Sequence, residues 1–309
     1  MNIIHRVSII AATLLLLQVA AVAAQTADEY IELGVEQGHE GKVQEAIDSF
    51  SKALMLDSGN AGAYYNRGLA KSLAGDIRGA IDDYSRAIKL DPALLGAHNN
   101  RGFARAALGD FRGAIEDISK AIALDPSVPE FYNNRGTAKS AIGDYKGAIA
   151  DYTRSIQLNP HLAGAYNNRG LARNLGGDPR GAISDFTLAL ERDQRYDAAW
   201  YNRGNARVAT GDYRGAVADY DKALILNQRL VEAYNNRGYA KAALGDYRGA
   251  IDDMSLLLKA RPDNAEAYYN RGIARKQLGD VSGAIVDLKK AASLGDTLSV
   301  RVLKELLGR

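Results

Sequence analysis

A fixed repeat constrains this 309-residue chain more than any other feature. The tripeptide Asn-Arg-Gly occurs seven times at intervals of 34 residues, with no insertion or deletion between copies. A looser copy at Leu33-Gly34 precedes these seven. The eight resulting repeats span 27–60, 61–94, 95–128, 129–162, 163–196, 197–230, 231–264 and 265–298. A constant period of roughly 20–50 residues is typical of stacked repeat proteins, so we expect one continuous domain with no linker.

Each repeat has the pattern of two helices joined by a tight turn. In the second repeat, residues 61–73 and 77–90 carry their larger side chains at spacings of three and four, which places those side chains on one helix face. Gly75-Asp76 separates the two segments. Glycine supplies a left-handed helix stop, and aspartate caps the following helix through its exposed amides. The pattern predicts an all-α protein.

The spacing of these residues resembles that of tetratricopeptide repeat proteins. In the second repeat, the family's signature positions hold Tyr64, Gly68, Ala80, Tyr84, Ala87 and Pro92. Some repeats depart mildly from the pattern: Ser58, Gln194 and Gln228 replace the closing proline, and His98 replaces the first aromatic residue. The resemblance implies antiparallel helix pairs that stack into a right-handed superhelical solenoid with a concave inner groove. Residues 299–309 have apolar side chains on one side and are predicted to form a capping helix.

Residues 1–24 are unlike the repeats and have the features of a secretory signal peptide. Arg6 gives a positive start, an apolar run follows, and the segment ends in Ala21-Val22-Ala23-Ala24. We expect cleavage near Ala23-Ala24 and export, as in an exported bacterial repeat protein whose site of action is the periplasm. The alternative is an uncleaved membrane anchor; the apolar run is near the minimum length that spans a bilayer.

Three columns of charge recur in seven repeats and are absent together from the first. The arginine of each tripeptide is followed four residues later by a second cation, and an aspartate recurs on the second helix. The first repeat has Leu33, Gln37 and Ser49 at these positions. We therefore predict ion pairs that join each helix pair or link one repeat to its neighbour; the alternative is a set of solvated surface charges. The predicted pairs are Arg67–Asp83, Arg101–Asp117, Arg135–Asp151, Arg169–Asp185, Arg203–Asp219, Arg237–Asp253 and Arg271–Asp287.

The asparagine column is the candidate binding site. Asparagine is a mediocre helix former, so its repetition within helices calls for a cause. In several tetratricopeptide repeat proteins an asparagine at this place lines the groove and holds the backbone of an extended peptide, which the resemblance implies here. The alternative is that the amides bond helix ends or each other. The predicted groove residues are Asn66, Asn100, Asn134, Asn168, Asn202, Asn236 and Asn270 with Tyr65, Tyr201 and Tyr269.

Other classes of function find little support in the sequence. The chain has no cysteine and a formal charge of +2, and His39, His98 and His161 lie in three separate repeats without a partner at ligand spacing. We expect neither catalysis, nor a metal or other cofactor, nor nucleic-acid binding, nor membrane contact after signal cleavage. The predicted function is a non-catalytic scaffold that holds a peptide segment of a partner protein in the groove. The alternative is a structural or assembly factor of an envelope complex that acts through its outer face or edges, and the oligomeric state stays open.

Overall fold

The computed structural model describes residues 26–308, which form helices α2 to α18 and no strand. The predicted signal peptide lies outside these residues. The chain divides into two compact units, and the division falls between Ser127 and Val128, at the junction of the third and fourth repeats. Each repeat in such an array contacts only its neighbours, so no long-range contact ties distant repeats together.

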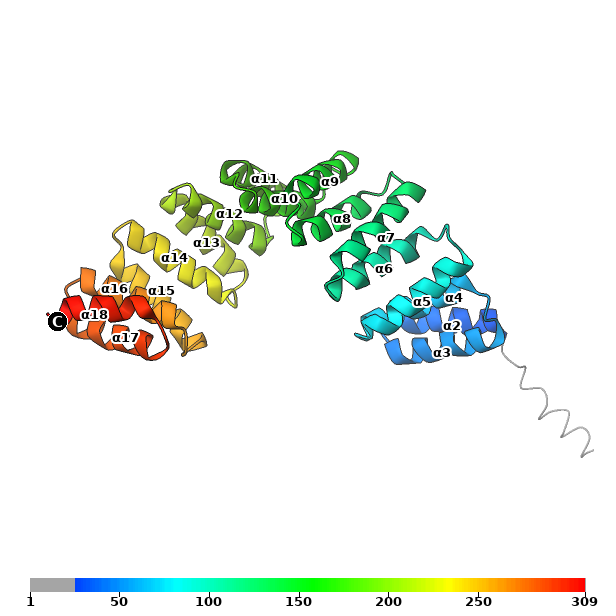
Figure 1. Cartoon of the computed structure of the whole chain (residues 1–309), viewed down its shortest axis with the longest axis horizontal. Helices are drawn as coiled ribbons and strands as arrows, with labels where there is room; N and C mark the ends of the chain where they lie inside the picture. Colours follow the sequence, from blue (N-terminus) through cyan, green and yellow to red (C-terminus); the bar gives the residue numbers. More distant parts are fainter. Residues whose placement is uncertain (1–25, 309) are drawn as a thin grey trace, which may run out of the picture. The chain divides into compact units, whose positions relative to one another are not determined.

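Unit 1 contains three helix pairs, coloured blue to green in Figure 1. Its helices are α2 (Ala27–His39), α3 (Val43–Leu56), α4 (Ala61–Leu73), α5 (Ile77–Leu90), α6 (Leu95–Ala107) and α7 (Phe111–Leu124).

Unit 2 contains the other five pairs and a last single helix, coloured green to red in Figure 1. Its helices are α8 (Pro129–Ala141), α9 (Tyr145–Leu158), α10 (Ala163–Leu175), α11 (Pro179–Arg192), α12 (Asp197–Ala209), α13 (Tyr213–Leu226), α14 (Val231–Ala243), α15 (Tyr247–Ala260), α16 (Ala265–Gln277), α17 (Val281–Ser293) and α18 (Thr297–Leu307).

Packing is strictly local within each unit. The two helices of a repeat pack together, and the second helix then packs on the first helix of the next repeat. Successive first helices also contact one another, as α4 contacts α6 and α12 contacts α14. We call the surface formed by the first helices of a unit its first-helix face. This arrangement is the all-α repeat solenoid that the sequence predicted.

The turn between the two helices of a repeat is made by the glycine and aspartate that the sequence indicated. Gly75 and its seven counterparts have φ between 78° and 89°, a left-handed conformation that glycine adopts without strain. The Asp76 carboxylate then accepts a hydrogen bond of 2.9 Å from the amide of Gly79, in the first turn of α5. Lys42 replaces the aspartate in the first repeat, and α3 begins without a side-chain cap.

The last helix, α18, packs on α17 as the predicted cap. It begins at Thr297, two residues before the predicted start, because Asp296 caps it by accepting a 2.6 Å hydrogen bond from the Ser299 amide. None of the helices within residues 26–308 is both long and apolar enough to cross a membrane.

The core of each repeat depends on a glycine in the first helix. In the sixth repeat, Gly204 lies against the ring of Tyr220, and a Cβ atom at Gly204 would be 2.6 Å from Cε1 of that ring. Gly34, Gly68, Gly136 and Gly170 meet an aromatic ring of their own second helix in the same way. Burial of the Tyr220 ring raises the pKa of its hydroxyl group. Close helix approach therefore explains why a poor helix former recurs here.

Substitution Gly204→Ala tests this close approach. We expect a loss of about 1–2 kcal/mol in the free energy of unfolding, because the strain of inserting a methyl group against Tyr220 exceeds the gain in helix propensity. Gly164→Ala is the matched control, since a Cβ there has no neighbour within 4 Å; that variant is expected to be neutral or slightly more stable. Urea unfolding followed by circular dichroism measures both, and equal effects of the two substitutions would contradict the explanation.

Candidate functional site

A buried carboxylate between two cations recurs in the repeats. Asp185 on α11 is only 1% exposed. Its Oδ2 accepts from Nε of Arg169 at 3.0 Å and its Oδ1 accepts from Nη2 at 2.7 Å, a two-point pairing that fixes the guanidinium plane. The second cation, Arg173, donates to the same Oδ2 at 2.8 Å. We call this arrangement the aspartate clamp.

The aspartate clamp forms at all seven positions where the sequence placed an Arg–Asp pair. The Nη2–Oδ1 distances run from 2.5 to 2.8 Å for Arg67–Asp83, Arg101–Asp117, Arg135–Asp151, Arg169–Asp185, Arg203–Asp219, Arg237–Asp253 and Arg271–Asp287. The second cation of each repeat, four residues after the arginine, bonds Oδ2 of the same aspartate. Because every aspartate of the set is buried, solvated surface charges do not describe this column.

The clamp also reaches the preceding repeat. Nη1 of Arg67 donates to the Ser51 hydroxyl at 3.1 Å, and Arg203 bonds Thr187 in the same way at 3.0 Å. Arg237 meets a carboxylate, Asp221, at 2.7 Å. The sequence left open whether the pairs join one helix pair or two repeats, and the structure shows that they do both.

The first repeat uses an uncharged substitute for the clamp. The Ser49 hydroxyl donates to Oε1 of Gln37 at 2.7 Å, between the same two helix positions that elsewhere carry the aspartate and the second cation. Leu33 stands in place of the arginine. A neutral hydrogen bond and an apolar side chain are therefore compatible with the fold.

This comparison within the chain gives a quantitative test. Asp185→Ser leaves two cations without their carboxylate and is expected to cost about 3 kcal/mol of unfolding free energy, the low end of the range for breaking a buried pair because Arg173 reaches solvent. Adding Arg169→Leu and Arg173→Gln reproduces the first-repeat solution and should recover most of that loss. Urea melts of the single, double and triple variants measure the coupling. If the costs simply add, with no recovery in the triple variant, the clamp is not a coupled unit.

The asparagine column forms hydrogen bonds between neighbouring first helices. Nδ2 of Asn168 donates to Oδ1 of Asn133 at 3.1 Å, and Asn202 bonds Asn167 in the same way at 3.0 Å. Asn100 instead donates to the Tyr65 hydroxyl at 3.2 Å. Each bond links a residue to one 35 positions earlier, so the column ties consecutive repeats together on the first-helix face.

The same pattern continues toward the C-terminus. Asn236 donates to the Tyr201 hydroxyl at 3.1 Å and to Oδ1 of Asn205 at 2.8 Å, and Asn270 donates to Asn235 at 3.4 Å. The sequence left two interpretations open for the column: contact with a peptide, or hydrogen bonds of the amides with helix ends or each other. In the structure the Nδ2 groups bond other asparagines or tyrosine hydroxyls of the preceding repeat. Sequence reasoning did not identify Asn205, and it placed Tyr65 and Tyr201 in the groove without predicting that their hydroxyls accept hydrogen bonds from the column.

The column remains accessible on the first-helix face. The seven asparagines, Asn66 and Asn134 included, and the three tyrosines are half-buried rather than enclosed. Oδ1 of Asn202 and Oδ1 of Asn270 accept no hydrogen bond from within residues 26–308. Asn202 and Asn270 thus each keep an acceptor and a second N–H that are not used by the bond to the neighbouring repeat.

Two apolar cavities open on the first-helix face at the same place in different repeats. The cavity in unit 1 has a volume of about 200 Å³ and is lined by Phe50, Asn66, Leu69 and others. The cavity in unit 2 measures about 330 Å³ and is lined by residues that include Tyr239, Tyr269, Asn270 and Ile273. Asn66 and Asn270 occupy the same position of the repeat, so each cavity pairs an apolar lining with one amide of the column. Of the three tyrosines predicted to lie in the groove, Tyr269 lines one of these two cavities.

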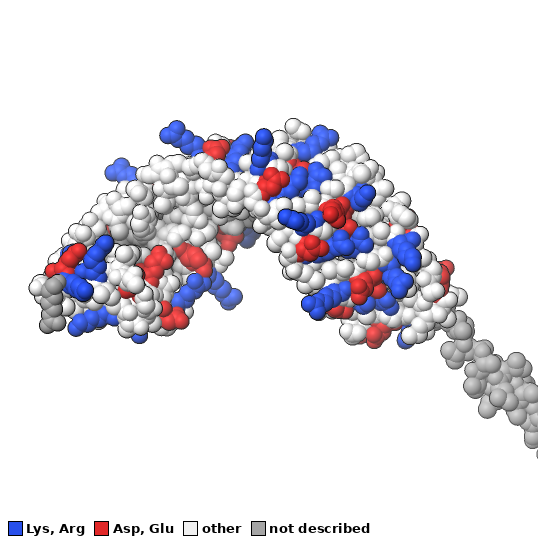
Figure 2. All heavy atoms as spheres, viewed as in Figure 1, with Lys and Arg blue, Asp and Glu red and all other residues white. Residues whose placement is uncertain are grey.

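The charge distribution fits protein contacts better than polyanion contacts. Positive and negative side chains alternate over the visible face of unit 1 in Figure 2, without a large area of one sign. In the described part of the chain, no group of three or more His, Cys, Asp or Glu residues is arranged to hold a metal ion.

Family models for tetratricopeptide repeats match residues 61–94, 96–128, 129–162, 204–245 and 235–296, which is more than half of the chain. The chain belongs to the tetratricopeptide repeat family. Such repeats are non-catalytic interaction modules, and none of the matching models describes an enzyme. This repeat protein is accordingly a protein–protein interaction scaffold.

Solved structures share the fold of this tetratricopeptide repeat protein. A chain of the APC/C hetero-tetramer Cut9–Hcn1 is 18% identical with a TM-score of 0.60, over 86% of this chain and 52% of that one, so this chain spans about half of it. A tetratricopeptide repeat protein from Parabacteroides merdae is 21% identical with a TM-score of 0.58, over 80% of this chain and 97% of that one. YrrB is 22% identical with a TM-score of 0.50, over 60% of this chain and 95% of that one. No curated protein matches the sequence.

Proposed function

We propose that the first-helix face of this scaffold binds an extended segment of a partner protein. The observation that carries the proposal is the recurrence of an apolar cavity beside a column amide, at Asn66 and again at Asn270. An extended peptide points alternate side chains to one side, so one of them can fill the cavity of a unit while the main chain runs beside the column amide at that cavity.

The amides suit the main chain of such a segment. The bonds between neighbouring repeats hold the side chains of Asn202 and Asn270 in place through Nδ2. Their Oδ1 atoms and remaining N–H groups then offer an acceptor and a donor without further ordering, which lowers the entropic cost of binding. Main-chain recognition of this kind gives affinity, and the cavities give selectivity for apolar side chains.

A solved relative offers limited support. YrrB is described as a tetratricopeptide repeat protein with an unusual peptide-binding site. At 22% identity the likeness establishes the fold, and peptide binding by the present chain rests on its own cavities and amides.

Filling the cavity in unit 2 tests the proposal. Ala242 lines that cavity, and Ala242→Trp places a large ring in it. Proteins captured from a cell extract by the wild-type chain are identified, and overlapping peptides from each are measured for binding. Ala242→Trp is expected to bind a peptide found to bind the wild-type chain at least about tenfold more weakly, because the ring occupies the space of a ligand side chain.

The matched control is Val286→Trp, which adds the same ring at an exposed position of α17, a second helix. This control should bind as the wild type does. If Ala242→Trp binds normally and Val286→Trp does not, the groove proposal is wrong. The alternative, an envelope assembly factor acting through its outer face or edges, would then account for the partner.

We also propose that the chain is exported to a bacterial periplasm after removal of residues 1–24. The basis is the sequence of that segment, with Arg6, the apolar run and the small residues up to Ala24. Expression of the full chain in a Gram-negative bacterium should give a periplasmic protein whose intact mass corresponds to a start at Ala24 or Gln25. The variant Ala21→Leu with Ala23→Leu should keep the leader. Recovery of the wild-type chain at full mass in the membrane fraction would support the anchor instead.

A further inference from the structure

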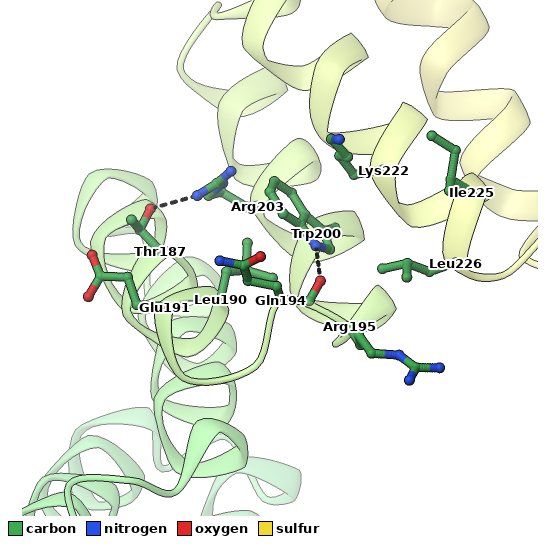
Figure 3. A pocket seen from close by; sticks show the side chains of 10 residues that line it. All are labelled: Thr187, Leu190, Glu191, Gln194, Arg195, Trp200, Arg203, Lys222, Ile225 and Leu226. Carbon is green, nitrogen blue, oxygen red and sulfur yellow. Dashed lines mark hydrogen bonds between the residues drawn. The ribbon is translucent and has the colours of Figure 1, made fainter.

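A third cavity lies away from the first-helix face, between the second helices α11 and α13. Its volume is about 570 Å³, within the range of ligand-binding pockets. Figure 3 shows Trp200 of α12 at its centre, with Leu190 on one side and Ile225 and Leu226 on the other. We call it the second-helix cavity. It lies entirely within unit 2.

The second-helix cavity occurs where the chain departs from its own repeat. Trp200 is the only tryptophan of the sequence and stands where most repeats have tyrosine, as at Tyr166 and Tyr234. Gln194 replaces the closing proline. Ile225 stands at a position that varies between repeats and is a lysine in two of them, Lys89 and Lys259. Two departures from the repeat and one variable position thus meet at this cavity.

The apolar lining is held in place but left uncovered. The Trp200 indole donates to the carbonyl oxygen of Gln194 at 3.0 Å, and the guanidinium of Arg203 lies 4.8 Å from the ring centre. Ile225 nevertheless exposes 72% of its surface and Leu226 exposes 40%. A fixed aromatic ring beside exposed aliphatic side chains is the composition of a protein-binding hot spot.

The charge at the mouth of the cavity is positive. Arg203, at the inner side, is neutralised by Asp219 at 2.8 Å, and Glu191 is paired with Arg192 at 3.0 Å. The side-chain charges of Arg195 and Lys222 have no acidic partner within residues 26–308. Both residues are exposed and line the cavity, so their charges are available to a ligand at its mouth.

We propose that the second-helix cavity binds a segment of a partner protein in which a bulky apolar side chain is flanked by carboxylates. The apolar side chain inserts between Trp200, Ile225 and Leu226, and the carboxylates meet Arg195 and Lys222. The cavity is a hollow with walls from two helices, which suits an inserted side chain better than a flat lipid surface. This contact is separate from the first-helix face, so it does not rest on groove binding.

The test uses a displayed library of short random peptides selected on the full chain. Peptides are counter-selected on the variant Ile225→Lys, which restores the residue found at this position in two other repeats. We expect enrichment of sequences with Leu, Phe or Trp next to Asp or Glu. Synthetic peptides that lack tryptophan are then titrated against the protein, with the fluorescence of Trp200 as the internal reporter, since no other tryptophan contributes.

Matched variants define the outcome. Ile225→Lys, and separately Arg195→Glu with Lys222→Glu, should each weaken peptide binding at least about tenfold, and salt should weaken wild-type binding. Met55→Lys is the control, because Met55 holds the same repeat position as Ile225 and is 84% exposed. It should bind normally, as should the groove variant Ala242→Trp, whose binding is measured by calorimetry because it carries a second tryptophan.

Several results would overturn the proposal. These are failure to enrich any peptide, enrichment of basic peptides, or unchanged binding by Ile225→Lys. A saturable shift of Trp200 emission with phosphatidylglycerol vesicles alone would assign the cavity to a lipid surface. A dimer of the wild type that Ile225→Lys converts to a monomer would assign it to a second copy of the chain. Loss of binding in Ala242→Trp would move the peptide to the first-helix face.

Discussion

The buried carboxylate of the aspartate clamp is the interaction on which the stacking of the repeats depends. Removing a charge from water is costly, so a buried aspartate is tolerated only where two cations reach both of its oxygens. In the fifth repeat that requirement fixes the position of Arg169 and Arg173 on the first helix relative to Asp185 on the second. Nη1 of Arg169 then bonds Thr153 in the repeat before. One charge thus specifies both the alignment within a repeat and the junction with its neighbour.

The clamp determines what the first-helix face can present. With the first helices held in register, residues 35 apart come within hydrogen-bonding distance, as Asn202 does with Asn167. The glycine column brings the second helix close, so that a ring such as Tyr220 fills the interior and the neighbouring first helices stay together. Packing, charge and amide bonds therefore support one another, and each local choice agrees with the repeat fold.

Much of this could be predicted from the sequence because the period supplies relative positions. An arginine and an aspartate 16 residues apart, present together in seven repeats and absent together from the first, were therefore predicted to be partners. The tetratricopeptide repeat fold followed from the same period. The cavities could not be predicted, since they depend on how far apart side chains such as Tyr239 and Tyr269 lie across a junction. The acceptor role of Tyr65 could not be predicted for the same reason. The start of α18 differed from the prediction because Asp296 caps the helix.

Selectivity for one partner is expected where the repeat is broken, because the recurring amides suit a main chain that many segments share. The clamp, which recurs in seven of the eight repeats, serves the stacking. A change in one repeat disturbs only its neighbours, so Trp200 and Ile225 can differ without loss of register elsewhere. Structures of 18–22% identity share the helices but leave the partner undetermined. The selectivity of this scaffold must then lie in its non-repeating residues, and the second-helix cavity gathers several of them around the only tryptophan of the chain.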